Sequence, residues 1–224
     1  RPPVELALTS TQTTLTSEPV LKFSDKLNHA RIPQEYVDAS YFINVPCLKT
    51  HNEGALTMGA KNHQGSIVED GDGPANQSAQ YMHYSLPYNS QGYGKFRHTV
   101  DYLGHEHLGG KTLIYIMDGI WAGRNWEGIV EKWQMAPFNN DYPNSLFLSQ
   151  DPVAIESVGF DFLLEEYKNK AASIQYPYIS GSDDYLFQAA DSSYWPEGIQ
   201  YDPEGDGTII SSLGVKEHWN NATD

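Results

Sequence analysis

Cysteine is almost absent from this 224-residue sequence, in which Cys47 is the only one. One cysteine cannot form an intrachain disulfide, and an iron–sulfur cluster needs several thiolate ligands, so both features are excluded. Cys47 lies in the apolar stretch Tyr41–Leu48, where its role is predicted to be that of a small buried hydrophobic residue.

Basic residues are also scarce, because 14 Lys and Arg stand against 29 Asp and Glu and give a formal net charge of −15. Such a chain would be repelled by nucleic acid, and no basic stripe offsets the repulsion, so a nucleic-acid partner is excluded. No apolar run approaches the roughly 18 residues that a membrane-spanning helix needs, so no transmembrane segment is predicted.

The remaining composition is that of a folded domain. Hydrophobic residues make up 39% of the chain and aromatic residues 12%, which is enough for a core. The length predicts a single domain over residues 1–224. Because the chain begins at Arg1 without Met, we expect either a removed targeting segment or a shortened natural chain.

Several short β-rich runs predict strands. Asp38–Leu48 is apolar on both faces, as in a strand buried on both sides of a sheet. Lys111–Asp118 is the clearest strand and is expected to end abruptly at Asp118. Further strands are predicted at Val4–Leu8 and Ser145–Ser149.

The strongest helical pattern covers Pro152–Lys170, with Asp151 as the N-cap. Shorter helices are predicted over 54–62, 96–103 and 184–190, and a helical turn over 22–29. Strands followed by helices indicate an α/β fold with a mostly parallel sheet flanked by helices and with long irregular loops.

Two regions lack periodicity. Residues 66–94 are rich in Gly, Asn, Ser, Gln, Tyr and His, which is typical of a lid or binding loop. Residues 171–224 form a loop-rich C-terminal part with one short helix.

Polar side chains follow the predicted strands and are expected to meet at the carboxyl-terminal rim of the sheet, where α/β proteins bind ligands. Lysines with a neighbouring amide can hold a phosphate or a carboxylate. The residues predicted to bind substrate are Lys49, Thr50, Asn62, His63 and Arg124.

Three residues are predicted to be catalytic: His51, Lys61 and Asp118. His51 and Asp118 would relay a proton or bind a divalent metal ion. The alternative is that Asp118 caps a turn and that the lysines are solvated.

Two further segments resemble metal sites. The loop Asp202–Gly207 carries Asp202, Glu204 and Asp206 at alternate positions, like the first half of a calcium loop, but Leu213 at the twelfth position excludes an EF-hand. The alternative is an acidic turn. Three histidines have a spacing compatible with a metal site, although nearby glycines favour a solvent-exposed loop: His98, His105 and His107.

The stretch Asp38–Ser66 resembles the signature of the domain of unknown function 362 family, an INxPxxKxH run followed by T…KNxxG. Met117–Gly119 and Asp151–Ala154 match further blocks in order. Residues 183–190 and 212–221 resemble a bacterial branch. The pattern falls on Ile43, Asn44, Pro46, Lys49, His51, Thr57, Lys61, Asn62 and Gly65.

This resemblance extends over scattered blocks of residues 38–224 and implies an α/β fold without a settled activity. Some relatives carry ferredoxin-like cysteine clusters, and this chain lacks those cysteines. The usual family domain extends on both sides of the chain, so a truncated domain without a leading strand and a closing segment is expected.

Two functions are compatible with these residues. The first is an enzyme acting on a small anionic or polar substrate at the rim, with or without a metal ion. The alternative is a non-catalytic extracytoplasmic ligand-binding or structural module with calcium in the acidic loop. The acidic surface, the aromatic loops and the bacterial resemblance favour a periplasmic or secreted location, and the oligomeric state is left open.

Overall fold

The computed structural model describes residues 14–18, 20–69, 85–87, 92–171 and 176–219. The strand predicted at Val4–Leu8 lies outside the described residues. So does most of the predicted lid over 66–94.

The central sheet is mixed. It contains β3 (Phe42–Asn44), β4 (Cys47–His51), β5 (Ala55–Thr57), β7 (Thr112–Gly123) and β8 (Ser145–Ser149). β3 and β4 follow one another along one side of β7 and pair with it in parallel. β8 pairs antiparallel with the other side of β7, and β5 pairs antiparallel with β4. The predicted α/β class is confirmed, with parallel pairing at the centre and antiparallel strands at the edges.

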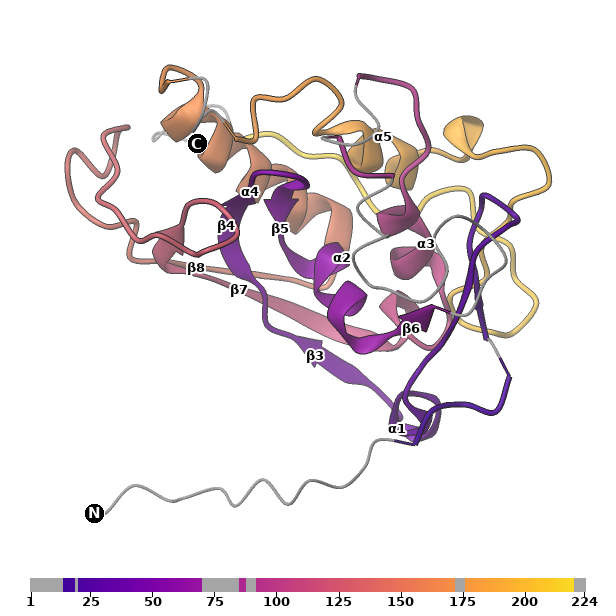
Figure 1. Ribbon diagram of the computed structural model, residues 1–224. Helices are drawn as coiled ribbons and strands as arrows, with labels where there is room; N and C mark the ends of the chain where they lie inside the picture. The colour runs from indigo at the N-terminus through magenta and orange to yellow at the C-terminus, as the bar shows by residue number, and fades with distance from the viewer. Residues whose placement is uncertain (1–13, 19, 70–84, 88–91, 172–175, 220–224) are drawn as a thin grey trace, which may run out of the picture.

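The described residues form five α-helices beside the sheet: α1 (Gln34–Asp38), α2 (Gly59–Asn62), α3 (His98–Gly104), α4 (Pro152–Tyr167) and α5 (Asp184–Ala190). Figure 1 shows α2, α3, α4 and α5 on the same side of the sheet, while α1 lies beside the start of β3. The helices on that side and the sheet face beneath them enclose the main hydrophobic core.

The close approach of α4 to the sheet depends on a glycine. A Cβ atom at Gly159 would lie 2.7 Å from the Met58 sulfur and 2.8 Å from the Met117 methyl carbon. Because Gly159 has no side chain, the fully buried Met58 and Met117 can fill the space between helix and sheet.

A second, smaller sheet packs beside the first. It is antiparallel and consists of β1 (Leu21–Lys22), β2 (His29–Arg31) and β6 (Val68–Glu69). The helical turn predicted over residues 22–29 is therefore wrong. The Asp25 carboxylate accepts the backbone N–H groups of Leu27 and Asn28 and forms a tight turn between two strands instead.

Other predicted elements compare as follows. β8 and α5 have the predicted bounds, and Asp151 caps α4 as expected. β7 does not end at Asp118, because its last residues pair with β4, where Gly123 lies opposite Lys49. The helix predicted over 54–62 is instead β5 followed by α2. Short 3₁₀ helices occupy His63–Ser66, Gly109–Lys111 and Ser192–Tyr194.

One face of the sheet differs from the prediction. The strand over Asp38–Leu48 was expected to be buried on both sides, yet Ile43 and Val45 are 55% and 58% exposed. The described helices cover only the opposite face (Figure 1). In the described part of the chain, no helix has the length and apolar composition required to cross a membrane.

We expect Asp151→Ala to lower the free energy of unfolding by about 1 to 2 kcal/mol, the usual cost of losing a helix N-cap. One Asp151 oxygen accepts the N–H groups of Val153 and Ala154, and the other accepts that of Val215. Urea unfolding would measure the change. The control is Asp191→Ala, because Asp191 caps only the three-residue 3₁₀ helix Ser192–Tyr194. An equal loss in both variants would contradict the capping role.

Candidate functional site

The end of β4 is tied to the segment that follows β7. The Lys49 ammonium donates to the carbonyl of Asn125 (3.0 Å), and the Asn125 N–H donates to the Thr50 hydroxyl (2.9 Å). A Cβ atom at Gly123 would lie 3.1 Å from the Lys49 Cγ, so this glycine gives the lysine side chain room. Burial lowers the pKa of Lys49.

His51 shapes the turn between β4 and β5. Its Nδ1 accepts the N–H groups of Glu53 and Gly54, both at 3.1 Å. Because Nδ1 accepts, the proton of the neutral imidazole lies on Nε2.

Lys61 extends from α2 toward this turn. Its Cε lies 3.2 Å from the position that a Gly54 Cβ would take. Burial, together with the nearby charge of Lys49, lowers the pKa of Lys61 to about 8, and Glu53 acts in the opposite direction. No hydrogen bond or ion pair joins the Lys61 ammonium to another described residue, so its charge is not neutralised by direct contact there.

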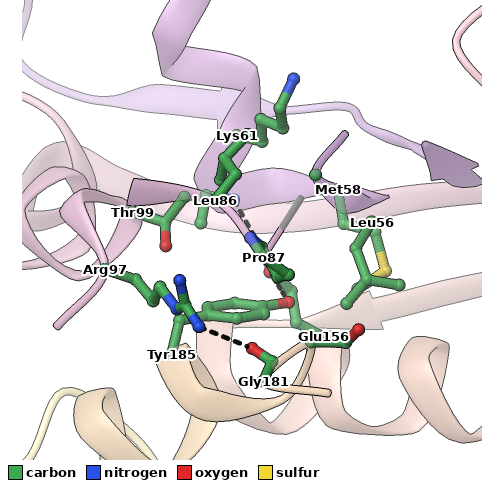
Figure 2. A pocket seen from close by; sticks show the side chains of 13 residues that line it. Leu56, Met58, Lys61, Leu86, Pro87, Arg97, Thr99, Glu156, Gly181 and Tyr185 are labelled. Carbon is green, nitrogen blue, oxygen red and sulfur yellow. Dashed lines mark hydrogen bonds between the residues drawn. The ribbon is translucent and has the colours of Figure 1, made fainter. Parts of the chain in front are cut away.

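A narrow pocket lies beside the Lys61 side chain (Figure 2). Its interior volume is about 20 Å³, which is enough for one water molecule. The Lys61 ammonium points away from Glu156 and Tyr185 in this view. Within the described residues, a ligand larger than water would therefore have to bind beside the ammonium, outside the pocket.

Glu156 is a buried carboxyl group that lines the pocket. One oxygen accepts the N–H of Ala60, and the other accepts the Tyr185 hydroxyl at 2.6 Å. Burial raises the pKa of Glu156 to about 7, although both hydrogen bonds favour the charged form. Sequence reasoning missed Glu156. Its place three residues after Val153 and four before Phe160 on the apolar side of α4 was the available signal.

Arg97 and Asp184 form a buried ion pair next to the pocket, with 2.9 Å between Nη2 and Oδ2. The same guanidinium donates to the carbonyls of Ser85, Gly92 and Gly181. Figure 2 shows Arg97 beside Tyr185 and bonded to Gly181. This pair holds three loop segments in place, and no sequence pattern pointed to it.

Asp118 lies on the face of the sheet that is turned away from α2 and α4. It is opposite Cys47 in the register, and its Oδ1 accepts the N–H of Ile120 at 2.9 Å. His51 is four residues beyond Cys47 along β4, which corresponds to roughly 13 Å. The strand register therefore does not bring Asp118 to His51.

Arg124 lies in the segment after β7, where its Nε contacts the Glu131 carboxylate at 3.3 Å. In the acidic loop, Asp202 accepts the N–H groups of Asp206 and Gly207, and Asp206 accepts that of Thr208. These carboxylates stabilise the turn. Asp202, Glu204 and Asp206 are not gathered into a group that could hold a metal ion in the described structure, so calcium binding by this loop stays a prediction.

The three histidines separate into different surroundings. His98 is buried in α3 against Tyr102, while the His105 Nε2 lies 3.1 Å from the Val20 carbonyl and its ring lies 5.6 Å from that of His107. Across the described ranges, no three His, Cys, Asp or Glu side chains form a group that could hold a metal ion.

Comparison with known proteins identifies the family. The sequence profile of a family described as a domain of unknown function, DUF362, matches residues 7–161, which is more than half of the chain. The chain belongs to the DUF362 family. A thylakoid-associated protein, sll1697, of Synechocystis sp. (strain ATCC 27184 / PCC 6803 / Kazusa) is 46% identical over 44 residues, or 20% of this chain and 14% of the relative. No solved structure matches the chain.

The motif that suggested the DUF362 family forms one structural unit. The Asn44 amide donates to the Gly59 carbonyl (3.0 Å) and accepts the Asn62 amide (2.8 Å). His63 is buried near Asn44, and burial lowers the pKa of its imidazole to about 4, with a smaller contribution from His105. Asn62 and His63, predicted to bind substrate, thus lie where they fix α2 and the Lys61 backbone.

Glu156→Gln should change how stability depends on pH. The folded carboxyl stays protonated up to about pH 7, whereas the unfolded one ionises near pH 4.5. Its contribution to stability is complete below about pH 4.5 and is lost as the pH rises to about 7. The variant should lack this loss, on the order of 3 kcal/mol at most. Urea unfolding at about pH 5 and pH 7.5 would measure it.

Glu165→Gln, on the exposed side of the same helix, is the matched control and should keep the parent's pH dependence. Part of the pH dependence of stability will remain in Glu156→Gln, because burial also raises the pKa of Asp101 to about 7. An unchanged pH dependence in Glu156→Gln would show that Glu156 is ionised in the folded chain.

Proposed function

We propose that this chain is an enzyme acting on a small anionic substrate at the carboxyl-terminal end of β4, with Lys61 binding the substrate. The observation that carries the proposal is the state of Lys61. Lys61 is half-buried, burial lowers its pKa, and its ammonium makes no ion pair or hydrogen bond with any described residue. Removing a cation from water without a partner is costly, so an anionic ligand would stabilise it.

Lys49 supports the same assignment. Its charge lies close enough to lower the pKa of Lys61, so two cations are held near each other at the end of one strand. Perturbed pKa values and like-charge neighbours cluster at functional sites, and a small phosphate or carboxylate would relieve this repulsion. Lys49 is anchored to the Asn125 carbonyl, which leaves Lys61 as the unanchored cation.

The pKa of about 8 also suits proton transfer. A lysine in this range exchanges protons near neutral pH, which an ordinary lysine does not. His51 is a second candidate for this task, because its Nδ1 accepts from the turn and the proton of its neutral ring therefore lies on Nε2. In this proposal Lys61 binds the anion and exchanges a proton with it, and His51 assists.

Lys61→Met should weaken binding of a small anion by about 10- to 100-fold, the usual contribution of a charged hydrogen bond. Calorimetric titration with inorganic phosphate and with oxalate would measure this and distinguish the two ligand chemistries. Lys132→Met, which removes an exposed lysine elsewhere, is the control. The proposal fails if the parent binds neither anion, or if both variants bind as the parent does.

Chemical labelling supplies an independent check. With an amine-reactive anhydride at about pH 8, Lys61 should react faster than the exposed Lys132, because a larger fraction of it is uncharged. Bound phosphate or oxalate should slow only the reaction of Lys61. Equal rates at both lysines would contradict the lowered pKa.

A further inference from the structure

The sheet face turned away from α2 and α4 is apolar, and no described helix covers it (Figure 1). Residues opposite each other in neighbouring strands point to the same face, so the register defines which side chains share it. We call this surface the open face. It comprises Ile43, Val45, Cys47, Ile114, Ile116, Asp118, Leu146 and Leu148.

The open face exposes large side chains that usually lie in a core. Ile43, Val45, Leu146 and Leu148 are between 54% and 58% exposed. Sheets with parallel strands are normally covered by helices on both faces, and a contiguous apolar patch on a protein surface marks an interaction site. The chemistry of the open face therefore indicates an occupant.

Asp118 determines which occupant fits. It is the charged residue of this set, and Leu146 and Cys47 lie opposite it on either side. Lys49 lies on the same side of β4, two residues beyond Cys47, but its ammonium is bonded to the Asn125 carbonyl. One of its oxygens accepts the Ile120 N–H, and no described residue donates to the other. Covering a carboxylate with apolar groups alone would be unfavourable, so the occupant must bring a basic side chain to it.

A second copy of this chain fits poorly. It would bring its own Asp118 and its own net charge of −15 to an interface that already carries a carboxylate. Like charges across an interface oppose association, whereas a basic partner is attracted to an acidic surface.

We propose that the open face docks an amphipathic α-helix of a separate protein, whose apolar stripe carries one Lys or Arg that pairs with Asp118. A helix is the element that already covers the opposite face of this sheet, where α4 packs on Met117. Its docking would complete a helix–sheet–helix arrangement. The argument for this docking surface does not rest on the anion site proposed at Lys61.

Cys47 provides the measurement, because it is exposed on the open face and is the only cysteine of the chain. Its reaction with a maleimide should be fast in the isolated chain, which should have the mass of a monomer by light scattering. The probe is a synthetic helix of about 20 residues, roughly 30 Å long, with a leucine stripe and one lysine within it. It should slow the reaction at least about tenfold, with saturation.

A twin peptide with Glu in place of that Lys should bind about tenfold or more weakly. Asp118→Asn should remove most of this difference while keeping the Ile120 hydrogen bond. Glu165→Gln, which removes a carboxylate from α4, should leave the difference unchanged. Leu148→Glu should abolish protection of Cys47, whereas Ile209→Glu, at an exposed apolar residue outside the sheet, should not.

Three results would overturn the proposal. Slow labelling in a dimer would assign the open face to a second copy. Slow labelling in a monomer would show that the chain covers the face itself. Equal protection by both peptides, or protection by neither, would show that no helix is selected by the charge of Asp118.

Discussion

The buried carboxylate of Glu156 holds together the helical layer on which the candidate site depends. From α4 it accepts the N–H of Ala60 in α2 and the hydroxyl of Tyr185 in α5, so one side chain joins three helices above the sheet. Lys61 follows Ala60 directly, and its position is therefore set by this contact. A leucine at position 156 would fill the space but could accept neither hydrogen bond, and the Ala60 N–H would lose its partner.

Elements with a strong local pattern could be predicted from the sequence, and elements defined by distant pairing could not. α4 combines an Asp-Pro start with an apolar periodicity, and β8 is a short β-rich run between polar residues, so both follow from local chemistry. β7 continues past Asp118 because β4 lies beside its last residues, and β5 is a strand for the same reason. No local signal encodes that pairing.

The same distinction applies to the site. Lys49, His51 and Lys61 could be named because they follow a predictable strand and turn, and the structure places Lys61 close enough to Lys49 for their charges to interact. Asp118 was grouped with them because its strand was expected to end there. β7 instead continues to Gly123, so Asp118 lies opposite Cys47, four residues from His51 along β4. Glu156 and Arg97 acquire their surroundings from three separate segments, so their burial could not be predicted from the neighbouring residues.

β4 links the open face to the candidate anion site. Leu48 and Thr50 point into the core, whereas Cys47, Lys49 and His51 alternate onto the other side of the strand. A helix docked over Cys47 would therefore lie two residues from Lys49, whose ammonium reaches Asn125 beyond the strand end. Covering Lys49 would reduce its exposure to water and lower its pKa further, and its charge acts in turn on Lys61. Occupation of the open face and binding at Lys61 would then be coupled through this single strand, and the coupling would be reciprocal.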